Sequence, residues 1–250
     1  MAKNRDSGVT RTPENPNSAL ASWLEEMERE EQDQRRNEID GAESIDQLKS
    51  FMTRNYGIEM SPDFDRYDVD AAKAYVQEVS DMMDEFPALK GTITRFGDSV
   101  RGKEMGSADL FGHLALNTKN MQSLDAANAK YGKDVKSGLH PEGTNAVNAV
   151  SHELGHMLEL AVINRTQGEF MKAVAWTSHS VGKDIVASAM SRLPSSSGKE
   201  SGKPISDISR YATHDASETV AEAVADYRAN GDMAKPLSRE IWRELKNRLK

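Results

Sequence analysis

The chain has 250 residues, with 40 acidic against 32 basic side chains and a formal net charge of −8. This balance argues against general nucleic-acid binding, which needs a basic face, and against a membrane anchor rich in Lys and Arg. The chain has no cysteine, so it contains no disulfide, and any bound zinc must be held by histidine and carboxylate.

The N-terminal residues, 1–42, are expected to form a separate charged arm. Residues 1–17 are polar, contain two prolines and lack the apolar segment of a signal peptide, which predicts disorder. Residues 18–40 are helical in propensity and strongly charged, which predicts a solvated helix. The alternative is an interaction helix that uses the apolar side chains of Leu20, Trp23, Leu24 and Met27.

The remaining residues, 43–250, are expected to form one α+β domain that is mostly helical with a small sheet, its core at about 91–235. Apolar spacing and helix-start signals predict helices over 43–55, 69–83, 144–163, 180–193, 217–229 and 236–249. Alternation predicts strands over 92–96 and 110–116, joined by a polar loop over 97–107. Residues 118–140 are predicted to be irregular, and 194–204 to be a loop.

A metal-binding motif, His152-Glu-Leu-Gly-His156, lies in the helix predicted over 144–163. Residues four apart share one helix face, with Cβ atoms about 5–6 Å apart, so both imidazoles can reach one metal ion. Glu153 would then lie beside a metal-bound water, where a general base is needed. Gly155 costs about 1 kcal/mol relative to Ala in a helix, so we expect another segment to approach closely there. The alternative is two histidines that bind no metal.

A catalytic zinc site has three protein ligands and one open position, so a third ligand must come from another segment. No histidine follows His156 at the spacing of a metzincin. The best candidates are Glu218 and Glu222, four residues apart on a predicted helix and flanked by Ala and Val. One would bind the metal and the other would support it, and spacing alone leaves either as the ligand.

The other histidines are weaker candidates. His140 is a conceivable ligand, but Pro141 and Gly143 beside it indicate a turn. His214, three residues after Tyr211, is a candidate hydrogen-bond partner near the site. His113, in a predicted strand, and His179, in a polar segment, are assigned no role.

Three segments together resemble a known family: the motif 152–156, Tyr211, and Glu218-Thr-Val-Ala-Glu222. They resemble the gluzincin metallopeptidases, in the arrangement of the anthrax lethal factor catalytic domain, and the zincin-like domains of phage structural proteins and bacterial effectors. The resemblance covers residues 140–229 and the strands before them. It implies a zincin-like fold that binds Zn²⁺ through His152, His156 and Glu218, with Glu222 as a supporting acid and Tyr211 as stabiliser of the oxyanion.

The activity implied is that of a zinc metallopeptidase acting on a protein or peptide, with Glu153 as general base. The strand predicted over 110–116 is expected to pair with an extended substrate. Residues 140–143 and 209–212 resemble phage-associated members, which implies a virion or assembly protein whose arm contacts phage structural proteins. A virion or cytoplasmic location, without membrane insertion, follows. The alternatives are a structural phage component with a vestigial zincin domain, a secreted effector, and a cytoplasmic regulatory peptidase.

Overall fold

The computed structural model describes residues 16–194 and 203–250, and it divides into two units between Asn37 and Glu38. The described part of the first unit belongs to helix α1 (Pro16–Asp40), the helix predicted for the arm. Residues 1–15, predicted to be disordered, lie outside the described residues, whereas 16 and 17 begin the helix. The four apolar side chains considered for an interaction face are exposed: Leu20, Trp23, Leu24 and Met27.

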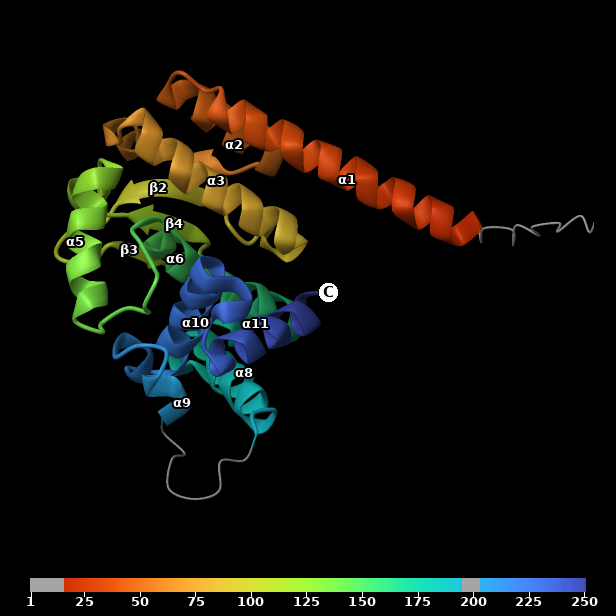
Figure 1. Ribbon diagram of the computed structural model, residues 1–250, viewed down its shortest axis with the longest axis vertical. Helices are drawn as coiled ribbons and strands as arrows, with labels where there is room; N and C mark the ends of the chain where they lie inside the picture. The colour runs from red at the N-terminus through yellow and green to blue at the C-terminus, as the bar shows by residue number, and fades with distance from the viewer. Residues whose placement is uncertain (1–15, 195–202) are drawn as a thin grey trace, which may run out of the picture. The chain divides into compact units, whose positions relative to one another are not determined.

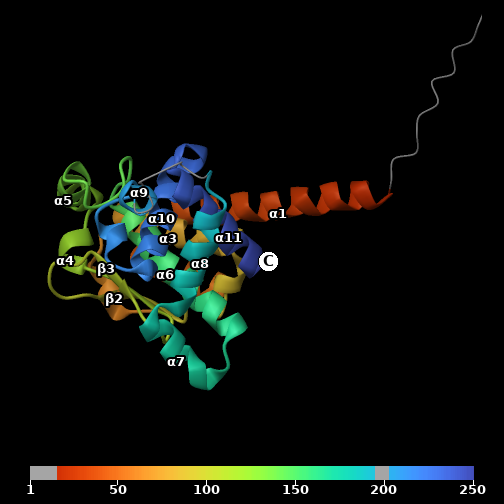
Figure 2. The same ribbon diagram turned by 90° about the horizontal axis from the view of Figure 1, so that it is seen from below.

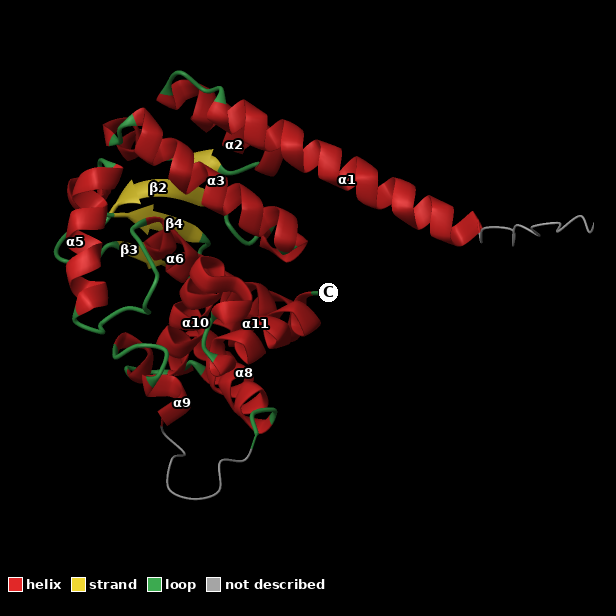
Figure 3. Cartoon of the chain, viewed as in Figure 1, coloured by secondary structure: helices red, strands yellow, loops and turns green. Residues whose placement is uncertain are grey.

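The second unit holds a small mixed sheet and a larger set of helices (Figures 1 and 3). Its strands are β1 (Glu59–Met60), β2 (Arg95–Ser99), β3 (Gly106–Ala108) and β4 (His113–Leu116). Its α-helices are α2 (Ile45–Tyr56), α3 (Val69–Glu85), α4 (Thr118–Met121), α5 (Leu124–Lys136), α6 (Val147–Thr166), α7 (Glu169–Ser178), α8 (Ser180–Ser191), α9 (Lys203–Ser206), α10 (Ala216–Asn230) and α11 (Pro236–Leu249). Short 3-10 helices are η1 (Pro62–Arg66), η2 (Pro87–Leu89), η3 (Tyr211–Thr213) and η4 (Gly231–Met233). The predicted fold class, mostly helical α+β with a small sheet and an N-terminal helix, is confirmed.

The sheet has the strand order β1-β2-β4-β3. Strand β2 runs parallel to β1 and to β4, whereas β3 runs antiparallel to β4 and forms one edge. The prediction that the strand over 110–116 would pair with substrate is therefore wrong, because β4 already has a neighbour on each side. The edge strand is β3, which begins in the segment predicted to be a loop.

The strand boundaries also differ from those predicted. Strand β2 begins at Arg95 rather than 92, because the preceding residues form a turn in which the amides of Thr92 and Ile93 donate to Leu89 O. Strand β4 begins at His113, after a turn over 109–112. The sequence of β3, Gly-Ser-Ala, has no large apolar side chain, and its strand conformation comes from pairing with β4.

Residues 118–140 were wrongly predicted to be irregular, since they contain α4 and α5. Side chains of Asn117 and Ser123 cap these helices by accepting hydrogen bonds from Asn120 N and Ala126 N. Only Ala127 and Tyr131 of α5 are buried, so the helix shows almost no apolar periodicity. Helix α7, not predicted, buries only one residue and lies at the periphery of its unit (Figure 2). The loop predicted over 194–204 falls largely on 195–202, outside the described residues.

Helix α6 is the centre of the second unit. It lies between the sheet and the C-terminal helices α8, α10 and α11 (Figure 1). Its residues are buried on nearly every side, as expected of a helix enclosed by other elements. Within the described part of the chain, no helix combines the length and apolar composition that crossing a membrane requires.

Helix α10 approaches α6 closely at Gly155, as the position of this glycine in the motif predicted. A Cβ atom there would lie 2.6 Å from Ala221 Cα and 3.3 Å from the Cβ atoms of Ala221 and Val224. The first of these is a backbone atom, which cannot turn aside as a flexible side chain could. The absence of a side chain at 155 therefore sets the distance between the two helices.

We expect Gly155→Ala to destabilise the protein by about 1–3 kcal/mol, because the added methyl forces α6 and α10 apart. Denaturant unfolding measures this change. Gly132→Ala on α5 is the matched control, since a Cβ there meets nothing within 4 Å. Equal stability of the two variants would contradict the close-packing argument.

Candidate metal centre

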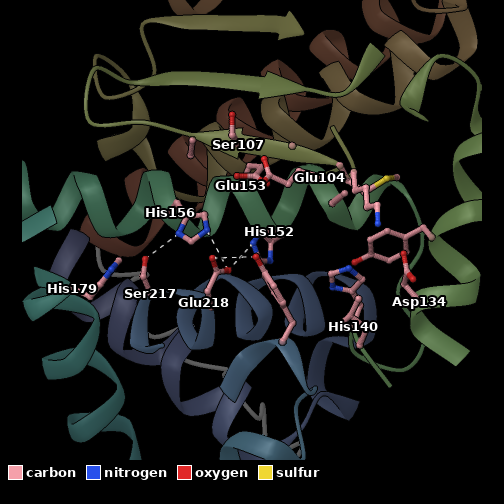
Figure 4. A pocket seen from close by; sticks show the side chains of 18 of the residues that line it. Glu104, Ser107, Asp134, His140, His152, Glu153, His156, His179, Ser217 and Glu218 are labelled. Atoms are coloured by element: carbon pink, nitrogen blue, oxygen red, sulfur yellow. Dashed lines mark hydrogen bonds and ion pairs between the residues drawn. The ribbon is translucent and has the colours of Figure 1, made fainter. Parts of the chain in front are cut away.

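Three side chains from α6 and α10 converge on one point (Figure 4). Glu218 Oε2 lies 3.1 Å from His152 Nε2 and 3.6 Å from His156 Nε2. The ligand atoms of the three residues all lie within 4.8 Å of one another, so this group could hold a metal ion. Asp215 fixes the turn that carries Glu218, because its side chain accepts hydrogen bonds from the backbone N–H groups of Ser217 and Glu218.

The donor set fits a divalent metal ion. Glu218 Oε2 is buried and accepts no hydrogen bond within the described part of the chain. A buried carboxylate oxygen without a donor is costly, and a cation between the three ligand atoms would compensate it. Two imidazoles and one carboxylate suit zinc or a neighbouring transition metal better than magnesium, which prefers oxygen ligands.

A buried carboxylate backs the ring of His152. Glu222 Oε1 lies 2.9 Å from His152 Nδ1 and 2.9 Å from His140 Nδ1. Glu222 Oε2 accepts a hydrogen bond from the Ser209 hydroxyl at 2.7 Å. An ionised carboxylate only accepts, so His152 donates from Nδ1, and its Nε2 atom faces Glu218. Glu222 thus lies on the side of the ring away from the group of three ligand atoms, the position of a supporting acid.

Charge interactions govern the ionisation of these buried groups. For Glu222, burial raises the pKa, but hydrogen bonds from His140 and His152 outweigh it and lower the pKa to about 2. For Glu218, burial likewise opposes the two motif histidines, and the net effect is a pKa far below the usual value. Burial lowers the pKa of His152, but Glu218 and Glu222 outweigh it and raise that pKa well above normal.

Glu153 and Tyr211 open on the same cleft as the metal group, in a cavity of about 440 Å³. Burial raises the pKa of the Glu153 carboxyl, and the neighbouring His152 and His156 lower it less, so the net shift is upward. Burial also raises the pKa of the Tyr211 phenol, with further contributions from nearby glutamates. The Tyr211 hydroxyl lies 3.5 Å from Glu218 Oε1.

Edge strand β3 lies against Glu153. A Cβ atom at Gly106 would lie 2.7 Å from Glu153 Cγ and 2.8 Å from its Oε1. Figure 4 shows Glu153 on the side of α6 that faces the strand, near Ser107. Gly106 was not identified from the sequence, because the strand that carries it has no detectable alternation; the signal was only a glycine in a polar segment.

The other histidines differ in their relation to the site. His140 lies in the turn expected for it and also touches the site, stacked on Tyr131 with ring centroids 4.6 Å apart. His214 is exposed and stacks on Tyr211 at 6.0 Å. His179, which had been assigned no role, lines the cleft, whereas His113 pairs with Asp109 at 3.0 Å.

Comparison of the chain with models of protein families, with curated proteins and with solved structures gives no significant match. The resemblance to gluzincins therefore stays a prediction from three short segments. The structure brings those segments, 152–156, Tyr211 and 218–222, to one cleft. That convergence is a property of this chain and does not depend on the resemblance.

We expect the purified chain to hold about one divalent metal ion and Glu218→Ala to lose it more completely than Glu222→Ala. Loss of Glu218 removes a ligand atom, whereas loss of a supporting acid weakens affinity by about 10–100-fold. Elemental analysis and titration with one chelator would compare the variants. Glu169→Ala, on an exposed side chain of α7, is the control. A stronger effect at Glu222 would reverse the two roles.

Proposed function

We propose that this chain is a zinc-dependent metallopeptidase that hydrolyses a protein or peptide. One observation carries the proposal. His152 and His156 of α6 converge with Glu218 of α10, and Glu153 of α6 lies beside them in a cleft bordered by a sheet edge. Metal ligands, a proton acceptor and a strand edge that can pair with substrate are the parts that amide hydrolysis on an extended chain requires. His152, His156 and Glu218 would hold the zinc.

Zinc bound there would polarise a substrate carbonyl and lower the pKa of its water toward about 7. Glu153 acts as general base and then as general acid: its carboxylate accepts a proton from water and donates it to the leaving amine. The raised pKa of Glu153 brings it closer to neutral pH, which favours both transfers. Tyr211 keeps its proton at neutral pH and can donate a hydrogen bond to the developing oxyanion.

The form of the cleft supports a polypeptide substrate. Strand β3 has a paired neighbour only in β4 within the described residues, so its other edge can pair with an extended peptide. The cleft continues to both sides of the metal group (Figure 4): Glu104 and Asp134 lie toward one end, and His179 toward the other. Trp176 and Ala108 add apolar surface to the lining, so the cleft offers contacts to both polar and apolar substrate residues.

An inactive structural role remains the alternative. A site kept only for structure would need its metal ligands and their supporting groups, but not Glu153. Here Glu153 is buried and aligned with the cleft at a cost in desolvation, which favours an active enzyme. Association with a phage particle stays a prediction from residues 140–143 and 209–212.

Glu153→Gln should retain zinc and lose nearly all hydrolysis, because the amide keeps the shape of the side chain but cannot accept the proton. Zinc content by elemental analysis, and cleavage of a mixed peptide library read by mass spectrometry, test both parts. Glu169→Gln, on the exposed start of α7, controls for loss of one charge. Hydrolysis by Glu153→Gln at the parent rate would contradict the assigned role.

Gly106→Ala should lower hydrolysis at least tenfold while zinc is retained, because the new methyl would displace the Glu153 carboxylate and leave the ligand atoms in place. Gly168→Ala is the matched control, since a Cβ there meets nothing within 4 Å. The same peptide library and metal analysis apply. If Gly106→Ala cleaves as fast as the control, Glu153 tolerates the contact and the argument fails.

A further inference from the structure

We propose that Ser217 and Glu159 form a positioning pair that holds His156 in the tautomer able to bind a metal ion through Nε2. The inference rests on the metal site of the proposed function, and it adds two residues to that site. Glu159 follows His156 by one helical turn on α6, and Ser217 precedes Glu218 on α10. Neither residue belongs to the three segments that resemble gluzincins.

The pair forms a chain of short hydrogen bonds in the protein interior. His156 Nδ1 lies 3.0 Å from Ser217 Oγ, and the Ser217 hydroxyl donates to Glu159 Oε2 at 2.6 Å. The other oxygen, Glu159 Oε1, accepts the backbone N–H of Gly182 on α8 at 2.9 Å. Glu159 is 1% exposed and Ser217 6%, so water has little access to compete for these bonds.

The count of protons fixes the direction of every bond. Both oxygens of Glu159 accept hydrogen bonds, one from the Ser217 hydroxyl and one from the Gly182 N–H. Ser217 has a single O–H, which donates its hydrogen bond to Glu159. Its oxygen must therefore accept from His156, which places the ring proton on Nδ1. In the neutral ring the lone pair is then on Nε2, which faces Glu218 Oε2, where the metal ion would bind.

The two motif histidines thus receive the same support by different routes. His152 donates directly to the Glu222 carboxylate, whereas His156 reaches the Glu159 carboxylate through a hydroxyl. Outer hydrogen bonds of this type fix the tautomer and orientation of metal-binding histidines. The second route also joins α6, α8 and α10, so the ring of His156 is held by the packing of three helices.

Glu159→Gln separates this role from plain packing. The Gly182 N–H needs an acceptor, so the amide oxygen must face it and the NH₂ group must face Ser217. Ser217 then accepts a hydrogen bond from the Gln NH₂ group, and its own hydroxyl can donate only to His156 Nδ1. The isosteric variant keeps each hydrogen bond but reverses two of them, which moves the ring proton to Nε2.

The test uses the full chain, stripped of metal and titrated with zinc in competition with a chromophoric chelator. We expect Glu159→Gln and Ser217→Ala each to weaken zinc binding by about 10–100-fold. NMR of the imidazole nitrogens in the metal-free chain, at mildly alkaline pH, should show the His156 proton on Nδ1 in the parent and on Nε2 in Glu159→Gln. Glu244→Gln, a buried carboxylate of α11 paired with Arg192 and Arg248, is the matched control.

The outcomes are distinguishable. A parent chain that binds no zinc contradicts the proposed function, while the ring measurement still tests the tautomer. A parent that binds zinc, with Glu159→Gln equal to it in affinity and in ring proton, overturns the positioning pair alone. If Glu159→Gln does not fold, Ser217→Ala decides the matter, and parent-like zinc affinity in that variant overturns the proposal.

Discussion

The close contact between α6 and α10 at Gly155 is the constraint on which the site depends. Both helices carry charged side chains at their shared surface, and those side chains meet only because the backbones approach closely. Small residues at the contact, Gly155 and Ala221, make that approach feasible, so the metal site depends on how these two helices pack. A wider separation would leave Glu218 out of reach of both histidines, whatever their rotamers.

A partly buried ion pair with α3 connects the same two helices. Arg228 on α10 donates to both oxygens of Glu78 on α3, at 2.9 and 2.8 Å, and Ser151 on α6 donates to the same carboxylate at 2.7 Å. Burial alone lowers the pKa of Arg228, but Glu78 outweighs it and raises that pKa. Ser151 directly precedes His152, so this ion pair fixes the backbone beside the metal group.

The sequence predicted the centre of the site better than its borders. The motif helix and α10 were predictable because their apolar residues recur at helical spacing. The close helix contact at Gly155 was predictable because glycine destabilises a helix interior and is expected there only where another segment approaches. Strand β3 was not, since Gly-Ser-Ala acquires its conformation only by pairing with β4. Glu159 offered a signal that went unused: a charged residue within the apolar run Met-Leu-Glu-Leu-Ala. Its partner Ser217 is identified only when two helices are placed together.

The number of buried carboxylates explains why a metal ion suits this interior. Glu153, Glu159 and Glu222 are buried, and Glu218 is part-buried with one buried oxygen, so these carboxylates without compensation would make folding costly. Histidine, serine and backbone donors satisfy Glu159 and Glu222, and Glu153 responds to burial by a raised pKa. Glu218 differs, because one buried oxygen lacks a hydrogen-bond donor while two imidazole Nε2 atoms face it. Since outer hydrogen bonds direct both imidazole Nε2 atoms toward that oxygen, a metal cation between the three atoms would complete the arrangement.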